Sequence, residues 1–251
     1  MDQRILEARD LEGVLLIRDK LDLSAAFLIP HLLQLALTAN LRIVLLLVQD
    51  SLSHYQQALR KLGINLTNCI ASQQVIPVTI TSSLTSADFP KILVQQLASA
   101  CTEACQALTA SGVCVLIDSL SALAGLTDDQ EQWQAFLHYC HSLKTVTQGQ
   151  YACVMVTHED VEDDAHWISW LRHSAQVEIE VRALESGASQ DISGQVLVTR
   201  REAYWPTSAA QTSKLSSHEL DRQHDHAGSI GLQESRKVFC KLGPNDIRFF
   251  G

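Results

Sequence analysis

The chain has 251 residues, of which 46% are hydrophobic and 19% are charged, and its formal net charge at pH 7 is −9. This length fits one large α/β domain as well as two small ones, and the apolar content suffices for a substantial core. The negative charge argues against a free-standing nucleic-acid-binding protein with a basic surface. The charged fraction lies below the ~25% usual for soluble domains, which indicates that partners cover part of the surface.

Neither membrane insertion nor secretion is expected. The most apolar stretch, residues 21–48, falls short of the ~18 consecutive apolar residues of a membrane span. It is interrupted by Pro30, His31, Gln34, Asn40 and Arg42, among others. Residues 1–4 lack the apolar segment of a signal peptide, and the seven cysteines lie at scattered apolar positions without the spacing of a disulfide framework. We expect reduced core thiols and a cytosolic or nuclear protein without a membrane partner.

Short apolar runs alternate with amphipathic segments from residue 11 to residue 156. Continuous apolar runs are typical of parallel strands buried on both faces. Strands are predicted at residues 11–17, 41–48, 75–80, 113–117 and 151–156. Helices are predicted between them, at 23–39 with Ser24 as N-cap, from Ser51 to Gly63, from Asp88 to 108, and from a Thr127/Gln130 capping box to 143. Pro30 inside the first helix means that this helix either kinks there or begins closer to Pro30.

The pattern changes after the acidic run at residues 159–164, which precedes a further helix. Strands of period two are predicted at 177–182 and 195–201, and a hairpin over 238–250 turns at Gly243-Pro244-Asn245-Asp246. Residues 206–236 are polar and almost without periodicity, so we expect a disordered insertion there. The whole chain, 1–251, is predicted to be a single α/β domain with a mostly parallel central sheet, helices on both faces and C-terminal antiparallel strands.

A RecA-like nucleotide-binding domain would hold phosphate in the loop after the first strand. Such a loop needs glycines, a Lys for the β/γ oxygens and a Ser or Thr for Mg²⁺. Here residues 18–25 read RDKLDLSA, with no glycine and no GK[ST]. Asp19 and Asp22 would repel a triphosphate, and Lys20 and Ser24 have the wrong spacing. We therefore predict no functional P-loop, no nucleotide cofactor and no catalytic residue.

Asp118 ends an apolar strand where a Mg²⁺-binding Walker B aspartate would stand. Without the phosphate loop opposite it, we interpret Asp118 as a structural carboxylate bonded to Ser119, Ser121 or a helix N-terminus.

Two other kinds of chemistry have weak support in the sequence. Possible soft metal ligands lie on two amphipathic helices: Cys101, Cys105, His138, Cys140 and His141. Others lie in the polar insertion: His218, His224 and His226. No CxxC knuckle accompanies them, so core thiols and surface histidines explain them, and no metal site is predicted. No nucleophile elbow or oxyanion glycine surrounds any cysteine, which argues against a thiol nucleophile.

Two charged groups suggest partner contacts. The acidic run at 159–164 is a solvated loop by default and a contact for a basic partner otherwise. Arg200 and Arg201 are the only paired arginines, at a strand end, where they either extend to solvent or touch RNA phosphate.

Several stretches in order resemble the family of the sixth subunit of the Elongator complex. The first two strand–helix units, with Ser53-His54-Tyr55 and Lys61-Leu62-Gly63, are similar to that family. So are VCVLIDSLSALAGL, AFLHYCHSL, CVMVTHEDVEDD, ISGQVLVTRR and KVFCKLGPNDIRFFG. The resemblance covers most of the chain outside 67–110 and 206–236.

This resemblance implies a RecA-like fold without working Walker motifs and a non-catalytic accessory role. It implies a heterohexameric ring with two copies each of Elongator subunits four, five and six, which docks on the remaining subunits, binds tRNA and supports modification of the wobble uridine. The iron–sulfur and acetyl-CoA chemistry would lie on another subunit. Within this chain, Arg200 and Arg201 are the candidates for tRNA contact.

Two alternatives stay open from the residues. One is a RecA-type NTPase, which the missing phosphate loop disfavours. The other is a degenerate recombinase paralogue that mediates DNA repair, which should carry a basic single-strand-binding loop that this acidic chain lacks.

Overall fold

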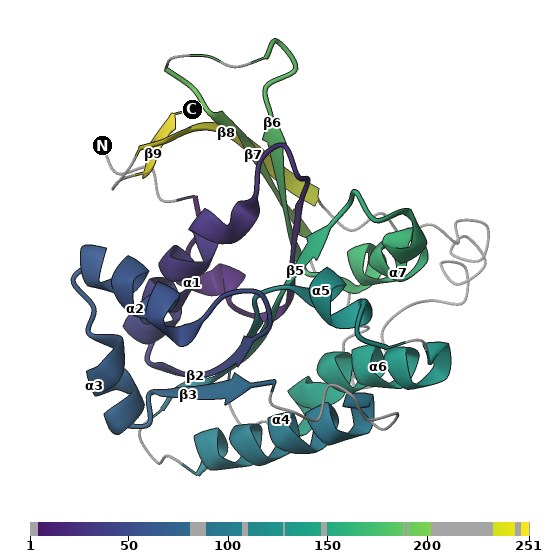
Figure 1. Cartoon of the computed structure of the whole chain (residues 1–251). Helices are drawn as coiled ribbons and strands as arrows, with labels where there is room; N and C mark the ends of the chain where they lie inside the picture. Colours follow the sequence, from purple (N-terminus) through teal and green to yellow (C-terminus); the bar gives the residue numbers. More distant parts are fainter. Residues whose placement is uncertain are drawn as a thin grey trace, which may run out of the picture.

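The computed structural model describes residues 5–80, 89–106, 110–127, 129–146, 150–187, 189, 191–201, 233–243 and 247–250. Within these ranges the strands form one sheet in the order β3-β2-β4-β5-β1-β6-β7-β8-β9 (Figure 1). Its first five members are parallel: β1 (Gly13–Asp19), β2 (Leu41–Leu47), β3 (Val75–Thr79), β4 (Gly112–Ile117) and β5 (Gln150–His158). The predicted strands are therefore confirmed, and Pro77 lies on the edge strand β3, where a missing N–H is tolerated.

The second half of the sheet turns antiparallel after one further parallel strand. β6 (Val177–Ala183) runs parallel to β1 and antiparallel to β7 (Gly194–Arg201). β8 (Gln233–Leu242) and β9 (Ile247–Phe250) continue the antiparallel pairing. The predicted antiparallel extension is thus confirmed with one correction, since the first of these strands still follows the direction of β1.

Helices cover both faces of the parallel strands (Figure 1). α1 (Leu28–Thr38), α2 (Leu52–Lys61) and α3 (Leu66–Ala71) lie on one face, and α4 (Phe89–Cys105), α5 (Leu120–Ala124), α6 (Gln130–Val146) and α7 (Ala165–Ser174) lie on the other. Alternate residues of β1 point to the two cores: Leu15 and Ile17 to the first, Val14 and Leu16 to the second. No helix among the described residues is long and apolar enough to span a membrane.

Local signals explain where the helices begin. Ser24 Oγ accepts a hydrogen bond from Ala26 N–H (3.2 Å), a short 3₁₀ turn (Ala25–Phe27) follows, and α1 begins at Leu28. Pro30 therefore lies in the first turn, where its missing N–H is harmless, and the helix does begin close to it. Ser51 Oγ caps α2 at His54 N–H (3.3 Å), as predicted.

Other predictions need correction. Asp129, not Thr127, caps α6, because its Oδ1 accepts from Gln132 N–H (3.0 Å). The short helices α3 and α5 were not predicted. Cys105 is exposed, so it is not a core thiol, whereas Cys69 is half-buried and packs against the first core. All seven cysteines are free.

Two predictions fall wholly or partly outside the described residues. Of the insertion predicted at 206–236, Gln233–Arg236 belong to β8, and 206–232 lie outside the described part of the chain. The predicted cap Asp88 also lies outside it.

Candidate functional site at the carboxyl ends of the parallel strands

The parallel strands β2, β4, β5 and β1 are neighbours in this order, so the residues at their carboxyl ends meet at one edge of the sheet. Ligands of open α/β sheets bind outside this edge. The side chains gathered there belong to Asp19, Gln49, Asp118, Ser119 and His158, at or just after the ends of these strands.

The β1–α1 loop occupies the position of a phosphate-binding loop and closes on itself. Leu23 N–H donates to the Lys20 carbonyl (3.0 Å), and these two residues form an isolated antiparallel bridge. Asp19 Oδ2 accepts from Ala25 N–H (2.5 Å), and the Asp19 side chain is fully buried. A phosphate oxygen at this N–H would have to displace a carboxylate of like charge, so the loop does not offer a phosphate cradle.

Asp118 makes a closed set of hydrogen bonds. Its Oδ1 accepts from the backbone N–H groups of Val48 (2.7 Å) and Gln49 (3.1 Å), and its Oδ2 accepts from Asp50 N–H and Tyr55 Oη–H (3.1 and 3.2 Å). Burial raises the pKa of Asp118, and these four donors oppose that rise. The carboxylate holds the turn between β2 and α2, which agrees with a structural role, although its partners differ from the serines that the sequence suggested.

His158, which the sequence did not single out, is the centre of the edge. Its Nδ1 lies 2.5 Å from Asp19 Oδ1, and its Nε2 lies 3.2 Å from Ser119 Oγ and 3.1 Å from Gln49 Oε1. The hydrogen bond to Asp19 raises the pKa of His158 against the effect of burial, and the charges of Asp19, Asp160 and Asp164 add to the rise. A histidine at the carboxyl end of a buried strand is the signal that could have identified it.

The Asp19–His158–Ser119 chain has the connectivity of a catalytic triad but not its access. Ser119 has no solvent exposure, and its Oγ accepts from Ala122 N–H (3.1 Å) as the N-cap of α5. A nucleophile must reach its substrate, and this hydroxyl is held inside by the helix that it caps. The three residues therefore form a structural hydrogen-bond chain that connects β1, β5 and α5.

Beside this edge, Arg18 is buried among carboxylates. Its Nη2 lies 2.5 Å from Glu178 and 3.3 Å from Glu180, and its Nη1 contacts Glu159. Burial alone would raise the pKa of Glu178, but the guanidinium groups of Arg18, Arg172 and Arg201 outweigh it and the net shift is downward. This network joins β1 and β6 to Glu159, the residue after β5, and to Arg172 of α7.

The two arginines predicted to contact tRNA point to opposite faces of β7 and have structural partners. Arg200 makes a two-pronged pair with the buried Asp10 (2.5 and 2.8 Å) and donates to the Ile5 carbonyl (3.2 Å). Arg201 pairs with Glu178 (2.7 Å) and donates to the carbonyls of Arg172 and Ala175. Their contact with tRNA stays a prediction, and each must be considered first as part of the fold.

The sequence offers several histidines and cysteines as possible metal ligands. In the described ranges no three His, Cys, Asp or Glu side chains are placed to hold a metal ion. His138 and His141 lie edge-on or tilted against Trp170, with ring centroids 5.0 and 6.0 Å away. His218, His224 and His226 lie outside the described residues.

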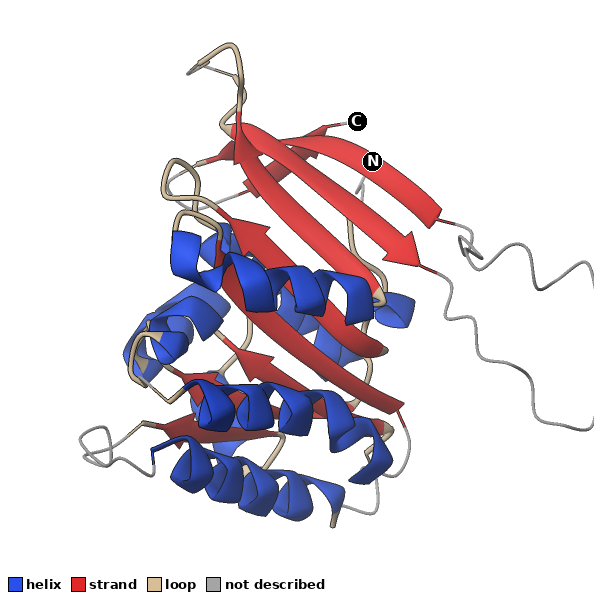
Figure 2. Cartoon of the chain, turned by 90° about the vertical axis from the view of Figure 1, so that its right-hand side faces the viewer, coloured by secondary structure: helices blue, strands red, loops and turns tan. Residues whose placement is uncertain are grey.

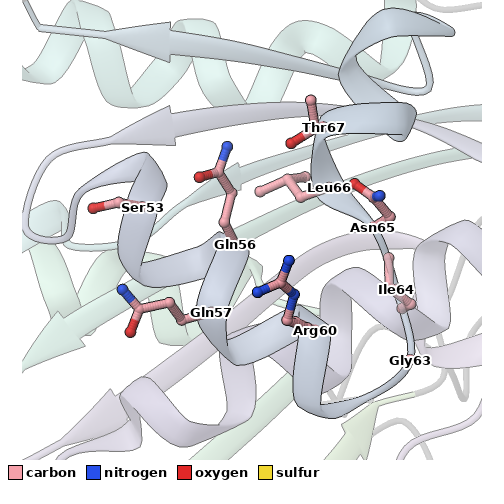
Figure 3. A pocket seen from close by; sticks show the side chains of 9 residues that line it. All are labelled: Ser53, Gln56, Gln57, Arg60, Gly63, Ile64, Asn65, Leu66 and Thr67. Atoms are coloured by element: carbon pink, nitrogen blue, oxygen red, sulfur yellow. The ribbon is translucent and has the colours of Figure 1, made fainter.

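A hollow of about 350 Å³ lies between α2 and α3 (Figure 3). Its residues are mostly polar and uncharged: Ser53, Gln56, Gln57, Arg60, Gly63, Ile64, Asn65, Leu66 and Thr67. Arg60 is the single charged side chain of this lining, and no nucleophile–base pair faces it, so the hollow does not indicate an active site.

Two curated proteins are similar to this chain in sequence. The chain is 26% identical over 197 residues to Elongator complex protein 6 of Xenopus tropicalis, which covers 70% of this chain and 74% of that protein. The Xenopus laevis protein of the same name is 24% identical over the same length and coverage.

Two solved structures share the fold. A KaiC-like protein from Pyrococcus horikoshii matches with a TM-score of 0.57 at 10% identity over 95% of this chain and 89% of that one. The flagellar accessory protein FlaH of Methanocaldococcus jannaschii matches with a TM-score of 0.51 at 14% identity over 74% and 76%. The RecA-like fold is thereby confirmed. Residues 7–219 match the family described as Elongation complex protein 6, and the chain therefore belongs to that family.

Proposed function

We propose that this chain is a non-catalytic accessory subunit of Elongator. In this proposal it assembles with subunits four and five into a hexameric ring, which docks on the remaining subunits, binds tRNA and supports carboxymethyl-type modification of the wobble uridine. The protein would work in the cytosol, the nucleus or both. Family membership supports the place of this chain in the Elongator complex. The ring and the binding of tRNA go beyond what family membership supports.

The main support for a non-catalytic role is that the chain's own hydrogen bonds occupy the positions where a nucleotide and Mg²⁺ would bind. The loop that would bind phosphate instead directs its own Asp19 carboxylate at Ala25 N–H, and Asp118 has four donors in place of a metal ion. Both groups would have to lose buried hydrogen bonds before a nucleotide and Mg²⁺ could enter. The buried Ser119 likewise supports the absence of hydrolase chemistry at the same edge.

The test is affinity purification of the tagged full-length chain from cells, with mass spectrometry of its partners. We expect the other Elongator subunits in stoichiometric amounts, and a marked loss of carboxymethyl-type wobble uridine in cells that lack the chain. Recovery of a recombinase and single-stranded DNA instead, or normal wobble modification after deletion, would reject the proposal.

A separate titration tests the site itself. We expect no ATP binding to the purified chain at micromolar concentrations of either component. The full-length variant Asp19→Ala, which lacks the repelling carboxylate, is titrated for comparison. Micromolar ATP affinity of the unaltered chain would overturn the non-catalytic assignment without affecting membership of the complex.

A further inference from the structure

A row of side chains crosses the antiparallel half of the sheet on its outer face. In the strand register Arg182 of β6 lies opposite Gln195 of β7, Gln195 opposite Phe239 of β8, and Phe239 opposite Phe250 of β9. Directly opposite residues share a face of an antiparallel sheet. Their neighbours along the strands point the other way, into the core: Val181, Val196, Val238 and Cys240.

The row ends in an aromatic pair that solvent can reach. Phe250 is 44% exposed and Phe239 is half-buried. The Nζ of Lys237 lies 5.4 Å from the centroid of the Phe239 ring. Large side chains of this kind are normally buried, so an exposed and a half-buried phenylalanine in register, with a cation beside them, indicate a surface built for contact.

Cations flank the aromatic pair on both sides. Lys237 and Lys241 alternate with Phe239 along β8, so all three share the outer face, and Arg248 lies opposite Lys241. Glu234 is the one acidic residue of β7, β8 and β9, and it lies on the opposite face, across from Arg200. A chain of net charge −9 therefore keeps carboxylates off this face of the three strands.

The helices leave this region open. In Figure 2, α4, α6 and α7 lie in front of the lower, parallel part of the sheet, and the upper antiparallel strands face the viewer beyond them. We call the outer face of β8 and β9, with Lys237, Phe239, Lys241, Arg248 and Phe250, the basic–aromatic face.

We propose that the basic–aromatic face docks a single-stranded segment of RNA, with bases stacked on the two phenylalanines and phosphates against the three cations. Unpaired RNA offers bases free for stacking on aromatic rings, and flanking cations follow the backbone. Alternate residues of a strand are about 6.7 Å apart, so Lys237 and Lys241 place one cation on each side of the Phe239 ring along β8. A protein partner fits less well, because lysine is depleted in the centres of protein interfaces.

This inference rests on the proposed function only for the identity of the RNA, an unpaired part of tRNA. The face itself is tested first with the lone full-length chain and a single-stranded RNA oligonucleotide carrying 4-thiouridine, at low salt. After irradiation, mass spectrometry should find the adduct on the peptide that carries Phe239 or Phe250. Adducts that map elsewhere would overturn the proposal, whatever complex the chain belongs to.

Affinity is then measured with the assembled ring and a labelled anticodon stem-loop. Lys237→Gln/Lys241→Gln should weaken binding and lower the salt slope of log K by about 1.4, because two single-strand phosphate contacts are lost. Phe250→Leu should weaken binding about fivefold or more at an unchanged salt slope, because stacking is lost and charge is kept. Arg236→Gln removes one positive charge from the same strand but from its other face, and should change the affinity less than twofold.

The outcomes separate cleanly. Wild-type affinity of both face variants in intact rings would reject the basic–aromatic face. Failure of these variants to enter the ring would show that a neighbouring subunit covers the face, which also rejects the proposal. A third outcome is that the wild-type ring binds no tRNA while the lone chain still gives the expected adduct. This result would count against the proposed function and would still support the RNA-docking face.

Discussion

Single charged residues in this protein act mainly through a buried partner. Arg200 is 12% exposed and holds Asp10, which is 1% exposed, beside the first described residues. Removing one member of a buried pair leaves the other charge without compensation. The same logic applies to Arg18 among its glutamates, and it explains why an acidic protein keeps arginines in its sheet.

Arg200→Ala should therefore destabilise the fold by about 3 kcal/mol, because Asp10 would stay buried and unpaired. The stability of Arg200→Lys should lie between that of Arg200→Ala and that of the unaltered chain, since an ammonium keeps the charge but cannot reproduce the two-pronged geometry. Urea unfolding followed by circular dichroism measures both. Equal stability of Arg200→Ala and the unaltered chain would mean that Arg200 is available for other contacts, including tRNA.

His158 should make stability depend on pH. Its pKa is raised in the folded state, so the protonated form is favoured by folding. The resulting stabilisation is complete below the ordinary pKa of about 6.5 and is lost as pH rises through the folded value. The melting temperature of His158→Gln should therefore lie furthest below that of the unaltered chain near pH 6, and the gap should narrow toward alkaline pH.

A control separates this effect from general titration. His166→Gln makes the same substitution at an exposed histidine of α7, outside the Asp19–His158–Ser119 chain, and should lower the melting temperature less than His158→Gln does near pH 6. A gap for His158→Gln that stays constant with pH would contradict the raised pKa of His158.

At the level of elements, close backbone contacts fix the strands. A Cβ at Gly112, where β4 begins between β2 and β5, would come within 1.8 Å of the Gln150 carbonyl oxygen. A Cβ at Gly125, at the end of α5, would meet nothing nearer than 3.7 Å. The two glycines therefore form a matched pair for testing the sheet.

Gly112→Ala should cost about 2 kcal/mol or more, because β4 and β5 must separate at this point. Gly125→Ala should be neutral within about 0.5 kcal/mol. Thermal unfolding of the two variants measures the difference. Similar melting temperatures would show that the β4–β5 pairing is looser at its start than the register indicates.

The sequence predicts most elements because their signals are local. Apolar runs mark the central strands, period-two alternation marks β6 and β7, and Ser24 and Ser51 mark helix starts. The helices α3 and α5 are six and five residues long, too short for helical periodicity to stand out from a loop.

The site could be predicted only in part. The absence of a phosphate loop and the structural position of Asp118 follow from residue types at strand ends. The role of His158 depends on Asp19, 139 positions away, and that of Arg200 on Asp10, 190 positions away. Such pairings are set by sheet order, and no local pattern in one sequence reveals them.

For the whole molecule, sparse charge and high apolar content point to surfaces that need partners. A subunit of the proposed ring would have two neighbours, and stable interfaces bury about 1,600 Å² in total each. We expect the lone chain to self-associate as its concentration rises and to become monodisperse when subunits four and five are present. Light scattering coupled to size exclusion measures this. A monodisperse monomer at high concentration without affinity for those subunits would contradict it.

The register between β7 and β8 has a consequence for chain connectivity. Arg201 and Gln233 are directly opposite each other, and the 31 residues 202–232 join them. Closing a connection costs about 0.6 kcal/mol of chain entropy for each doubling of its length, so the long connection weighs against the pairing by only a few kcal/mol relative to a tight turn. The ladder from Gly194 to Arg201 supplies the pairing by itself. The two strand ends are therefore natural points for inserting a reporter domain, with the sheet order preserved.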